Sequence, residues 1–166
     1  MKKSGNNHDL LWDAIDNDNL PELKIILENN IVEKQIKNEY GFSPLHNSIN
    51  KEFVEISKIL IHYGFDVDSQ DSKGQTPLHY CGFYNDIETA KLLLAYGANI
   101  NQIDIYGNGP LWTAVFNDKG FGRRIEIINI FVGAGANINH VNNAGRSPKS
   151  FADESSYDEV AKLLSS

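Results

Sequence analysis

The side chains that could carry out chemistry are few in this chain, and their spacing argues against a reactive site. Of the 5 histidines, His46 and His79 lie 33 residues apart, and the others share no metal-ligand spacing. A zinc site of the common types would show His-Glu-x-x-His or Cys-x-x-Cys, and neither pattern is present. Cys81 is the single cysteine, and we expect it to be a small buried residue rather than a reactive thiol. The sequence therefore predicts no metal site and no catalytic Cys/His or Ser/His/Asp group.

Glycine pairs are a second feature that could indicate chemistry, because glycine-rich loops bind phosphate groups. They lie at Gly107/Gly109, Gly120/Gly122 and Gly133/Gly135. None follows a predicted strand and opens a helix, as a dinucleotide-binding loop does, and Gly-Lys-Ser/Thr does not occur. We therefore expect no cofactor and no enzymatic activity, with an enzyme whose site is unrecognised as the remote alternative.

A fixed period organises the chain. Gly41, Gly74 and Gly107 are 33 residues apart, and each opens a similar phrase: Gly-Phe-Ser-Pro-Leu-His, Gly-Gln-Thr-Pro-Leu-His and Gly-Asn-Gly-Pro-Leu-Trp. A period of this length indicates one structural unit copied along the chain. Such a unit cannot bury its apolar face alone, so its neighbours must cover it. The units are therefore expected to form an extended stack with a long exposed surface.

Residues 71–103 show best how each unit should fold. Thr76 is placed to cap a helix whose first position is Pro77, where the missing N–H group costs nothing. This helix should end in a tight turn at Asn85, because asparagine tolerates the left-handed conformation. A second helix follows, with apolar residues at helical spacing, and Gly97 should end it.

The same alignment divides the chain into five units after a short tail. We expect an N-terminal tail at 1–7, a capping repeat at 8–37, repeats at 38–70, 71–103 and 104–141, and a C-terminal capping repeat at 142–166. The fourth unit is longer than the others, and its extra segment is placed at 118–122, between its two helices. In the last unit Lys149 stands where the inner units have leucine, so we expect the stack to stop there and the chain to be complete at both ends.

The motif Asp-x-x-Gly-x-Thr-Pro-Leu-His at 71–79, followed by Gly-Ala-Asn-Ile-Asn at 97–101, resembles the ankyrin repeat. The resemblance extends over about residues 8–166. It implies an all-α solenoid of about five stacked helix-turn-helix units, with β-hairpin-like finger loops along one edge. It also implies a structural role for His46 and His79, which in this family hydrogen-bond across neighbouring turns.

Composition limits the class of partner. The net charge is −7, and the densest basic spot is Arg123–Arg124, so we expect no nucleic-acid partner. An acidic balance suits a basic partner, and it also serves solubility alone. No apolar run is long enough to span a bilayer, and the start of the chain lacks the apolar stretch of a secretory signal. We expect a cytoplasmic protein that is monomeric by itself and does not enter membranes.

The positions that vary between ankyrin repeats are the candidates for partner binding. They lie at the finger tips, around the turn glycine, and at the end of the first helix of each unit. The candidates are Tyr40, Phe42, Lys51, Lys73, Gln75, Phe83, Tyr84, Tyr106, Asn108, Phe116 and Asn117. Aromatic side chains dominate interface energetics, and six of these residues are aromatic. We expect Tyr40, Phe83, Tyr84 and Tyr106 to be exposed on one continuous concave face; the alternative is that some of the rings pack against their own repeat.

Phe121, between the two glycines of the inserted segment, is a further candidate contact. The alternative is that this segment is a tolerated variation in loop length.

These features together favour a non-catalytic protein-binding module that engages a partner protein through its concave face and finger loops. A small acidic binder could mask the active cleft of a basic enzyme or toxin, as an inhibitor, antitoxin or immunity protein does. The alternative is a scaffold or targeting adaptor that bridges two proteins and needs two separate binding surfaces.

Overall fold

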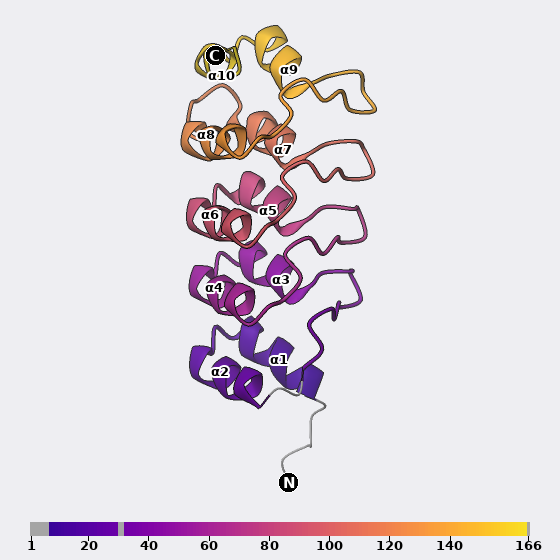
Figure 1. Ribbon diagram of the computed structural model, residues 1–166, viewed down its shortest axis with the longest axis vertical. Coiled ribbons are helices and arrows are strands. Elements are labelled where there is room, and N and C mark those ends of the chain that lie inside the picture. The colour runs from indigo at the N-terminus through magenta and orange to yellow at the C-terminus, as the bar shows by residue number, and fades with distance from the viewer. Residues whose placement is uncertain (1–6, 30–31, 166) are drawn as a thin grey trace.

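The computed structural model describes residues 7–29 and 32–165, and within them it contains ten helices and no strand. The helices follow one another as five pairs, stacked into an elongated body (Figure 1). Their bounds are α1 (Asn7–Asp16), α2 (Leu20–Glu28), α3 (Pro44–Asn50), α4 (Val54–His62), α5 (Pro77–Tyr84), α6 (Ile87–Ala95), α7 (Pro110–Asp118), α8 (Ile125–Gly133), α9 (Pro148–Glu154) and α10 (Asp158–Leu163). The expected N-terminal tail lies almost wholly outside the described residues.

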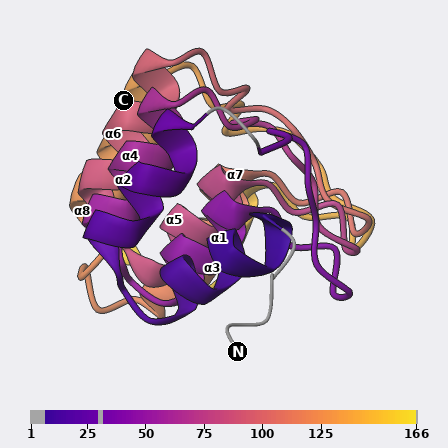
Figure 2. The same ribbon diagram turned by 90° about the horizontal axis from the view of Figure 1, so that it is seen from below.

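The five pairs are arranged in register. The first helices of the pairs, α1, α3, α5, α7 and α9, pack on one another in sequence, and so do the second helices, α2, α4, α6, α8 and α10. Figure 2, which looks along the stack, shows the two columns of helices with the connecting loops projecting to one side as fingers. The expected all-α repeat solenoid is confirmed.

The unit at 71–103 shows why these residues form a helix pair. Thr76 has extended backbone angles and forms a capping box with His79, and Pro77 is the first residue of α5. The helix ends at Asn85, whose φ of 62° places it in the left-handed region. Gly97, with φ of +86°, follows the end of α6. The predicted N-cap at Thr76, the turn at Asn85 and the helix end at Gly97 are all confirmed.

The fingers are built around turns at 38–42, 71–75, 104–108 and 142–146. In the second finger the Oδ1 atom of Asp71 accepts the N–H groups of Lys73 and Gln75, at 2.8 and 2.9 Å. Gly74 has φ of +76°, and a Cβ atom there would lie 3.3 Å from the Cα atom of Asp104 in the next finger. Glycine is therefore required both for the turn and for the close approach of the two fingers.

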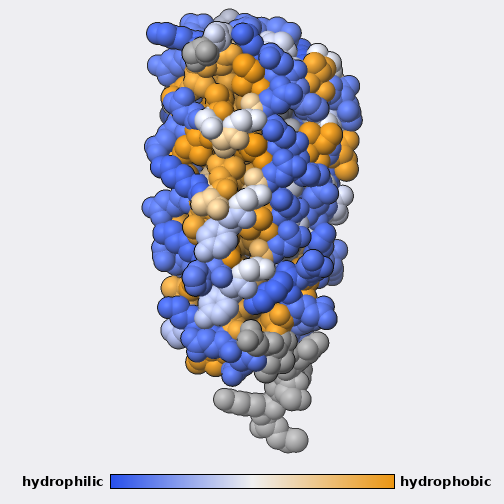
Figure 3. Space-filling model, in the orientation of Figure 1, coloured by the Kyte–Doolittle hydropathy of each residue, from blue (hydrophilic) through white to orange (hydrophobic). Residues whose placement is uncertain are grey.

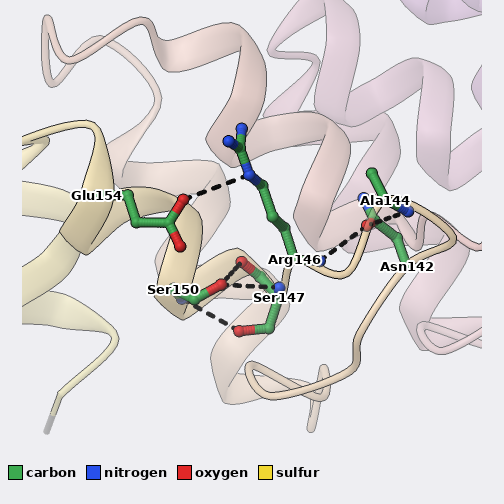
Figure 4. Close-up of polar contacts among 6 residues, drawn as sticks. All are labelled: Asn142, Ala144, Arg146, Ser147, Ser150 and Glu154. Atoms are coloured by element: carbon green, nitrogen blue, oxygen red, sulfur yellow. Dashed lines mark hydrogen bonds and ion pairs between the residues drawn. The ribbon is translucent and has the colours of Figure 1, made fainter.

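The last repeat closes its finger and caps its first helix with different side chains (Figure 4). The Oδ1 atom of Asn142 accepts the N–H groups of Ala144 and Arg146, at 3.0 and 3.1 Å. Ser147 and Ser150 then form a reciprocal capping box at the start of α9. Ser150 thus closes the capping box of α9 as His46 and His79 close those of α3 and α5.

The core is a continuous layer between the two columns of helices. Leu45, Leu78 and Leu111 are buried at equivalent positions of successive first helices. Lys149, at the corresponding position of α9, is only partly buried, because no described helix packs beyond it. Among the described residues, no helix has both the length and the apolar character needed to cross a membrane.

Candidate functional site

The inner face of the stack, defined here as the surface bounded by the first helices and the fingers, carries most of the candidate residues. Its exposed candidates are Tyr40, Lys73, Phe83, Tyr106 and Phe116. Its half-buried candidates are Phe42, Lys51, Gln75, Tyr84, Asn108 and Asn117. The expectation that Tyr84 is exposed is wrong, because this residue is half-buried. Its hydroxyl donates to the Oδ1 atom of Asn50 at 2.7 Å, across to the preceding repeat.

Five aromatic side chains form an N-terminal aromatic row along this face. Its members are Tyr40, Phe42, Tyr80, Tyr84 and Phe83, and consecutive ring centroids are 6.4, 5.7, 6.5 and 4.9 Å apart. The Tyr80 hydroxyl donates to the Oδ2 atom of Asp71 at 2.9 Å, and burial raises the pKa of this phenol. The two inner tyrosines are thus fixed by hydrogen bonds, while Tyr40 and Phe83 at the two ends remain exposed, at 65% and 49%.

A C-terminal aromatic cluster continues the same face over α7 and α9. The Trp112 ring stacks with Phe116, with centroids 6.4 Å apart, and lies 5.0 Å from Phe151. Phe151 in turn meets Tyr157 edge to face at 5.6 Å. Because the aromatic rings hold one another, this part of the face presents a largely preformed apolar surface.

Two hollows open on the inner face between first helices and fingers. The central hollow is lined by Gln75 of the second finger, by Thr113 of α7, and by Tyr80, Phe83 and Tyr84 of α5, among others. The N-terminal hollow is lined by Trp12 and Asp16 of α1, by Asn47 of α3 and Lys51 directly after it, and by residues 38–40 and Phe42 of the first finger. The face therefore offers shaped recesses for side chains of a partner.

The periodic histidines are structural. His46 and His79 are buried, and their Nε2 atoms lie 2.9 Å from the carbonyl oxygens of Gln75 and Asn108 in the next finger. Their Nδ1 atoms accept the N–H groups of Ser43 and Thr76, so the proton is on Nε2 and is donated to the carbonyl. Burial lowers the pKa of His46 to about 4 and lowers that of His79 as well. Neutral imidazoles thus tie successive repeats together, as the resemblance implied.

The segment between α7 and α8 is closed by one carboxylate. The insertion was expected at 118–122, whereas α7 runs through Asp118 and the connection occupies 119–124. Asp118 is buried and accepts the N–H groups of Gly122 and Arg124, at 2.9 and 2.8 Å. Phe121 projects from this closed loop with 69% of its side chain exposed, and the Arg123 guanidinium lies over its ring at 5.3 Å.

Arg124 anchors the same loop to the preceding repeat. One of its terminal nitrogens donates to the carbonyl oxygen of Phe83, at the end of α5. Burial lowers the pKa of this guanidinium, and the neighbouring Asp118 carboxylate opposes that effect. The loop therefore lies against the same end of α5 that presents Phe83, which makes it continuous with the central part of the inner face.

The side chains of metal-ligating types and the cysteine have the following surroundings in the described residues. In the ranges 7–29 and 32–165, no three His, Cys, Asp or Glu side chains are placed together to hold a metal ion. Cys81 is fully buried, and burial raises the pKa of its thiol well above the ordinary value. A thiol in this state is a poor nucleophile, which agrees with its expected role as a small core residue.

Two comparisons with known proteins agree with this geometry. The family model for ankyrin repeats, in three copies, matches residues 10–104, which is more than half of the chain. The chain belongs to the ankyrin repeat family. An ankyrin repeat protein of Rickettsia bellii (strain RML369-C) is 40% identical to it over 67 residues. That match spans 37% of this chain and 40% of the relative, so the two share only part of their lengths. Ankyrin repeats are generally protein–protein interaction modules.

Several aromatic residues of this ankyrin stack were missed by the choice of variable positions. Tyr80, Trp112 and Phe151 lie within the first helices, at or next to the position of the repeated histidine. A helical spacing of four residues joins Tyr80 to Tyr84 and Trp112 to Phe116, and that signal could have identified them from the sequence. Trp12 and Tyr157, from the two terminal repeats, lack such a pattern.

Proposed function

We propose that this protein is a non-catalytic binding module that engages a partner protein through its inner face and finger loops. The observation that carries the proposal is the run of aromatic side chains from the first finger over α5, α7 and α9, together with the two hollows that these side chains help to line. Aromatic residues in well-packed recesses are the usual centres of binding energy in protein interfaces. The candidate residues of the inner face and Phe121 of the adjoining loop are the proposed contacts.

The proposal extends to the consequence of binding. The net charge of −7 favours a basic partner, and a binder with no catalytic group acts by covering the surface it occupies. The partner is then a basic enzyme or toxin, and the ankyrin stack serves as its inhibitor, antitoxin or immunity protein. Purification of the complex from the native cytoplasm, followed by an assay of the partner with and without saturating binder, tests this. Full activity of the partner in the saturated complex excludes it.

Phe83 provides the sharpest test of the binding face. Phe83→Ala should weaken the affinity for a co-purified partner by about 2 kcal/mol, roughly 30-fold, because the ring lines the central hollow and is exposed at the centre of the face. Isothermal titration of the purified pair measures this change. Stability should fall by less than about 1 kcal/mol, since half of the ring is already in water.

Ile25→Ala is the matched control. Ile25 is an exposed apolar residue, at 60%, on α2 of the outer column. Its truncation should leave the affinity unchanged. An equal loss of affinity in Phe83→Ala and Ile25→Ala contradicts the proposal that the inner face binds the partner. Unchanged affinity in both Phe83→Ala and Tyr106→Ala contradicts it as well.

A second surface favours the adaptor as the alternative function. On the outer helices, a broad hollow is lined by Ile59, Tyr63, Leu92 and Tyr96 between the lysines of α2, α4 and α6. Figure 3 also shows an apolar stripe running lengthwise, with hydrophilic residues on both sides. An adaptor requires two partners bound at once, so crosslinking of native complexes should recover two proteins at separate faces. Recovery of one partner at the inner face alone rejects this alternative.

A further inference from the structure

The N-terminal hollow combines aromatic walls with carboxylates. Trp12 of α1 and Tyr40 and Phe42 of the first finger line it, together with the acidic residues Asp16 and Glu39. The Tyr40 and Phe42 rings are tilted by 54° with respect to each other, and Phe42 is held from behind by the edge-to-face contact with Tyr80 in the next repeat. Aromatic faces beside carboxylates are the surroundings that attract organic cations.

One of the two carboxylates is already satisfied within the protein. Asp16 forms an ion pair with Lys51, with 3.0 Å between Oδ1 and Nζ, and accepts a hydrogen bond from the Asn47 side chain at 2.8 Å. Lys51 also lies over the ring of Phe53, at 5.9 Å. This edge of the hollow is therefore close to neutral, and it shows that a cation is stable there.

The other carboxylate remains open to a ligand. Glu39 is exposed at the tip of the first finger, and it forms no ion pair within the described part of the chain. The nearby Lys37 donates instead to the carbonyl oxygen of Gln70, at 2.6 Å, which lies next to the second finger. The hollow therefore carries one uncompensated negative charge beside its aromatic walls.

This combination is not repeated along the stack. At the positions of Tyr40 and Phe42, the second finger has Lys73 and Gln75, and the last finger has Ala144 and Arg146. The aromatic pair is therefore not required by the finger turn, which forms in all four cases. A feature confined to one repeat is better explained by recognition than by folding.

We infer that the N-terminal hollow binds an arginine side chain of the partner protein. The inference rests on the proposed function, and it adds the chemistry of one contact. Arginine fits better than lysine because its planar guanidinium stacks on an aromatic ring while donating to a carboxylate, and it is less strongly hydrated. Tyr40 and Phe42 supply the rings, Glu39 supplies the acceptor, and Trp12 closes the inner wall.

The test uses the full chain and a small probe, so that no partner is needed. The labelled protein is titrated with the tripeptide acetyl-Gly-Arg-Gly-amide, and the ¹⁵N–¹H signals of the Trp12 indole and of the Tyr40 and Phe42 amides are followed. Saturable shifts in the millimolar range are expected, as for one exposed cation–π contact assisted by a carboxylate. Tyr40→Ala and Glu39→Gln should each weaken binding about 3-fold or more.

The controls separate a site from general attraction to an acidic protein. The chain has 2 tryptophans, and the Trp112 indole signal should not move. Ile25→Ala, at an exposed apolar residue of α2 in the outer column, should bind the probe like the unchanged protein. The inference is overturned if the citrulline tripeptide gives an equal response, or if the lysine tripeptide binds equally well or more tightly. It is also overturned by shifts at the Trp112 indole, or by a titration that does not saturate up to about 50 mM.

The inference can also fail while the proposed function stands. If a co-purified partner binds the double variant Glu39→Gln, Tyr40→Ala with full affinity but binds Phe83→Ala weakly, the inner face is confirmed and the arginine site is rejected. If no partner is captured but the tripeptide binds at Trp12 as expected, the chemistry of the hollow stands and the wider function must be sought elsewhere.

Discussion

At the residue scale, polar side chains in this stack do their structural work across the boundary between repeats. Each of the two buried histidines caps its own helix with Nδ1 and reaches the next finger with Nε2. In the fourth repeat Trp112 stands at the histidine position, and Gly109 gives α7 no side-chain cap. The hydrogen bond comes instead from the segment that leads into the last finger, where His140 Nε2 lies 2.9 Å from the Gly107 carbonyl oxygen. Within the described part of the chain Trp112 makes no such hydrogen bond, and its ring packs in the C-terminal aromatic cluster.

The protonation of His46 should make stability depend on pH. Its pKa is about 4 in the folded protein, against about 6.5 in the unfolded chain, so the unfolded chain takes up a proton first as the pH falls. The contribution of this group is complete above pH 6.5 and decreases toward pH 4. From pH 7 to pH 5 it should remove about 2 kcal/mol from the free energy of unfolding, measured by urea titration.

His46→Gln is the control for this pH dependence. The amide does not titrate, so the variant should be less stable at pH 7 but lose less stability between pH 6.5 and 4.5 than the unchanged protein. Parallel pH profiles for the two proteins would show that other groups cause the acid sensitivity.

The residues that sequence reasoning placed well are those whose role is local. Thr76, Asn85 and Gly97 act through their own backbone angles and a partner within a few residues, so the sequence alone predicts them. Tyr84 was misjudged because its partner, Asn50, is 34 residues away. The role of Trp112 in the aromatic cluster was not predicted, because its contact with Phe151 depends on how the fourth repeat meets the fifth.

At the element scale, the longer fourth unit shows how a solenoid accommodates extra residues. The helices α7 and α8 keep their places in the two columns, and the added length is confined to the connection at 119–124. Gly120 and Gly122 take positive φ angles there, and the Asp118 carboxylate holds the N–H groups that the bend would leave unpaired. The placement of the insertion between two helices follows from the sequence; the closing carboxylate required the structure.

Asp118→Ala should open this loop without disrupting the stack. The substitution removes two hydrogen bonds from a buried carboxylate, so the free energy of unfolding should fall by about 3 kcal/mol. Amide exchange at Gly122 and Arg124 should accelerate, while exchange in α3 stays unchanged. Asp118→Asn keeps one acceptor oxygen and should lie between the two. Asp153→Ala, at an exposed carboxylate of α9, should change neither quantity; equal effects there would show that net charge is responsible.

At the scale of the whole molecule, the main helix contacts of each repeat in the described ranges are with its immediate neighbours. Contacts run from α1 to α3, α3 to α5, α5 to α7 and α7 to α9, with the second helices following the same order in the described residues. Stability in such a stack is approximately a sum of repeat and interface contributions. The inner face can therefore be continuous over several repeats while its two ends open independently, which lets the N-terminal hollow and the C-terminal aromatic cluster respond separately to substitution.

Leu164→Ala tests this independence. Leu164 is almost fully buried at the end of α10, and truncating a buried leucine removes about 3 kcal/mol from the structure around it. Because only the last two repeats share that packing, native-state hydrogen exchange should accelerate at least about ten-fold in α9 and α10 and leave α3 and α5 within two-fold of the unchanged protein. The arginine probe should still bind at Trp12 with unchanged affinity. Uniform acceleration from α1 to α10 would instead mean that the five helix pairs unfold as one unit, and that a change at either end of the inner face is felt along its whole length.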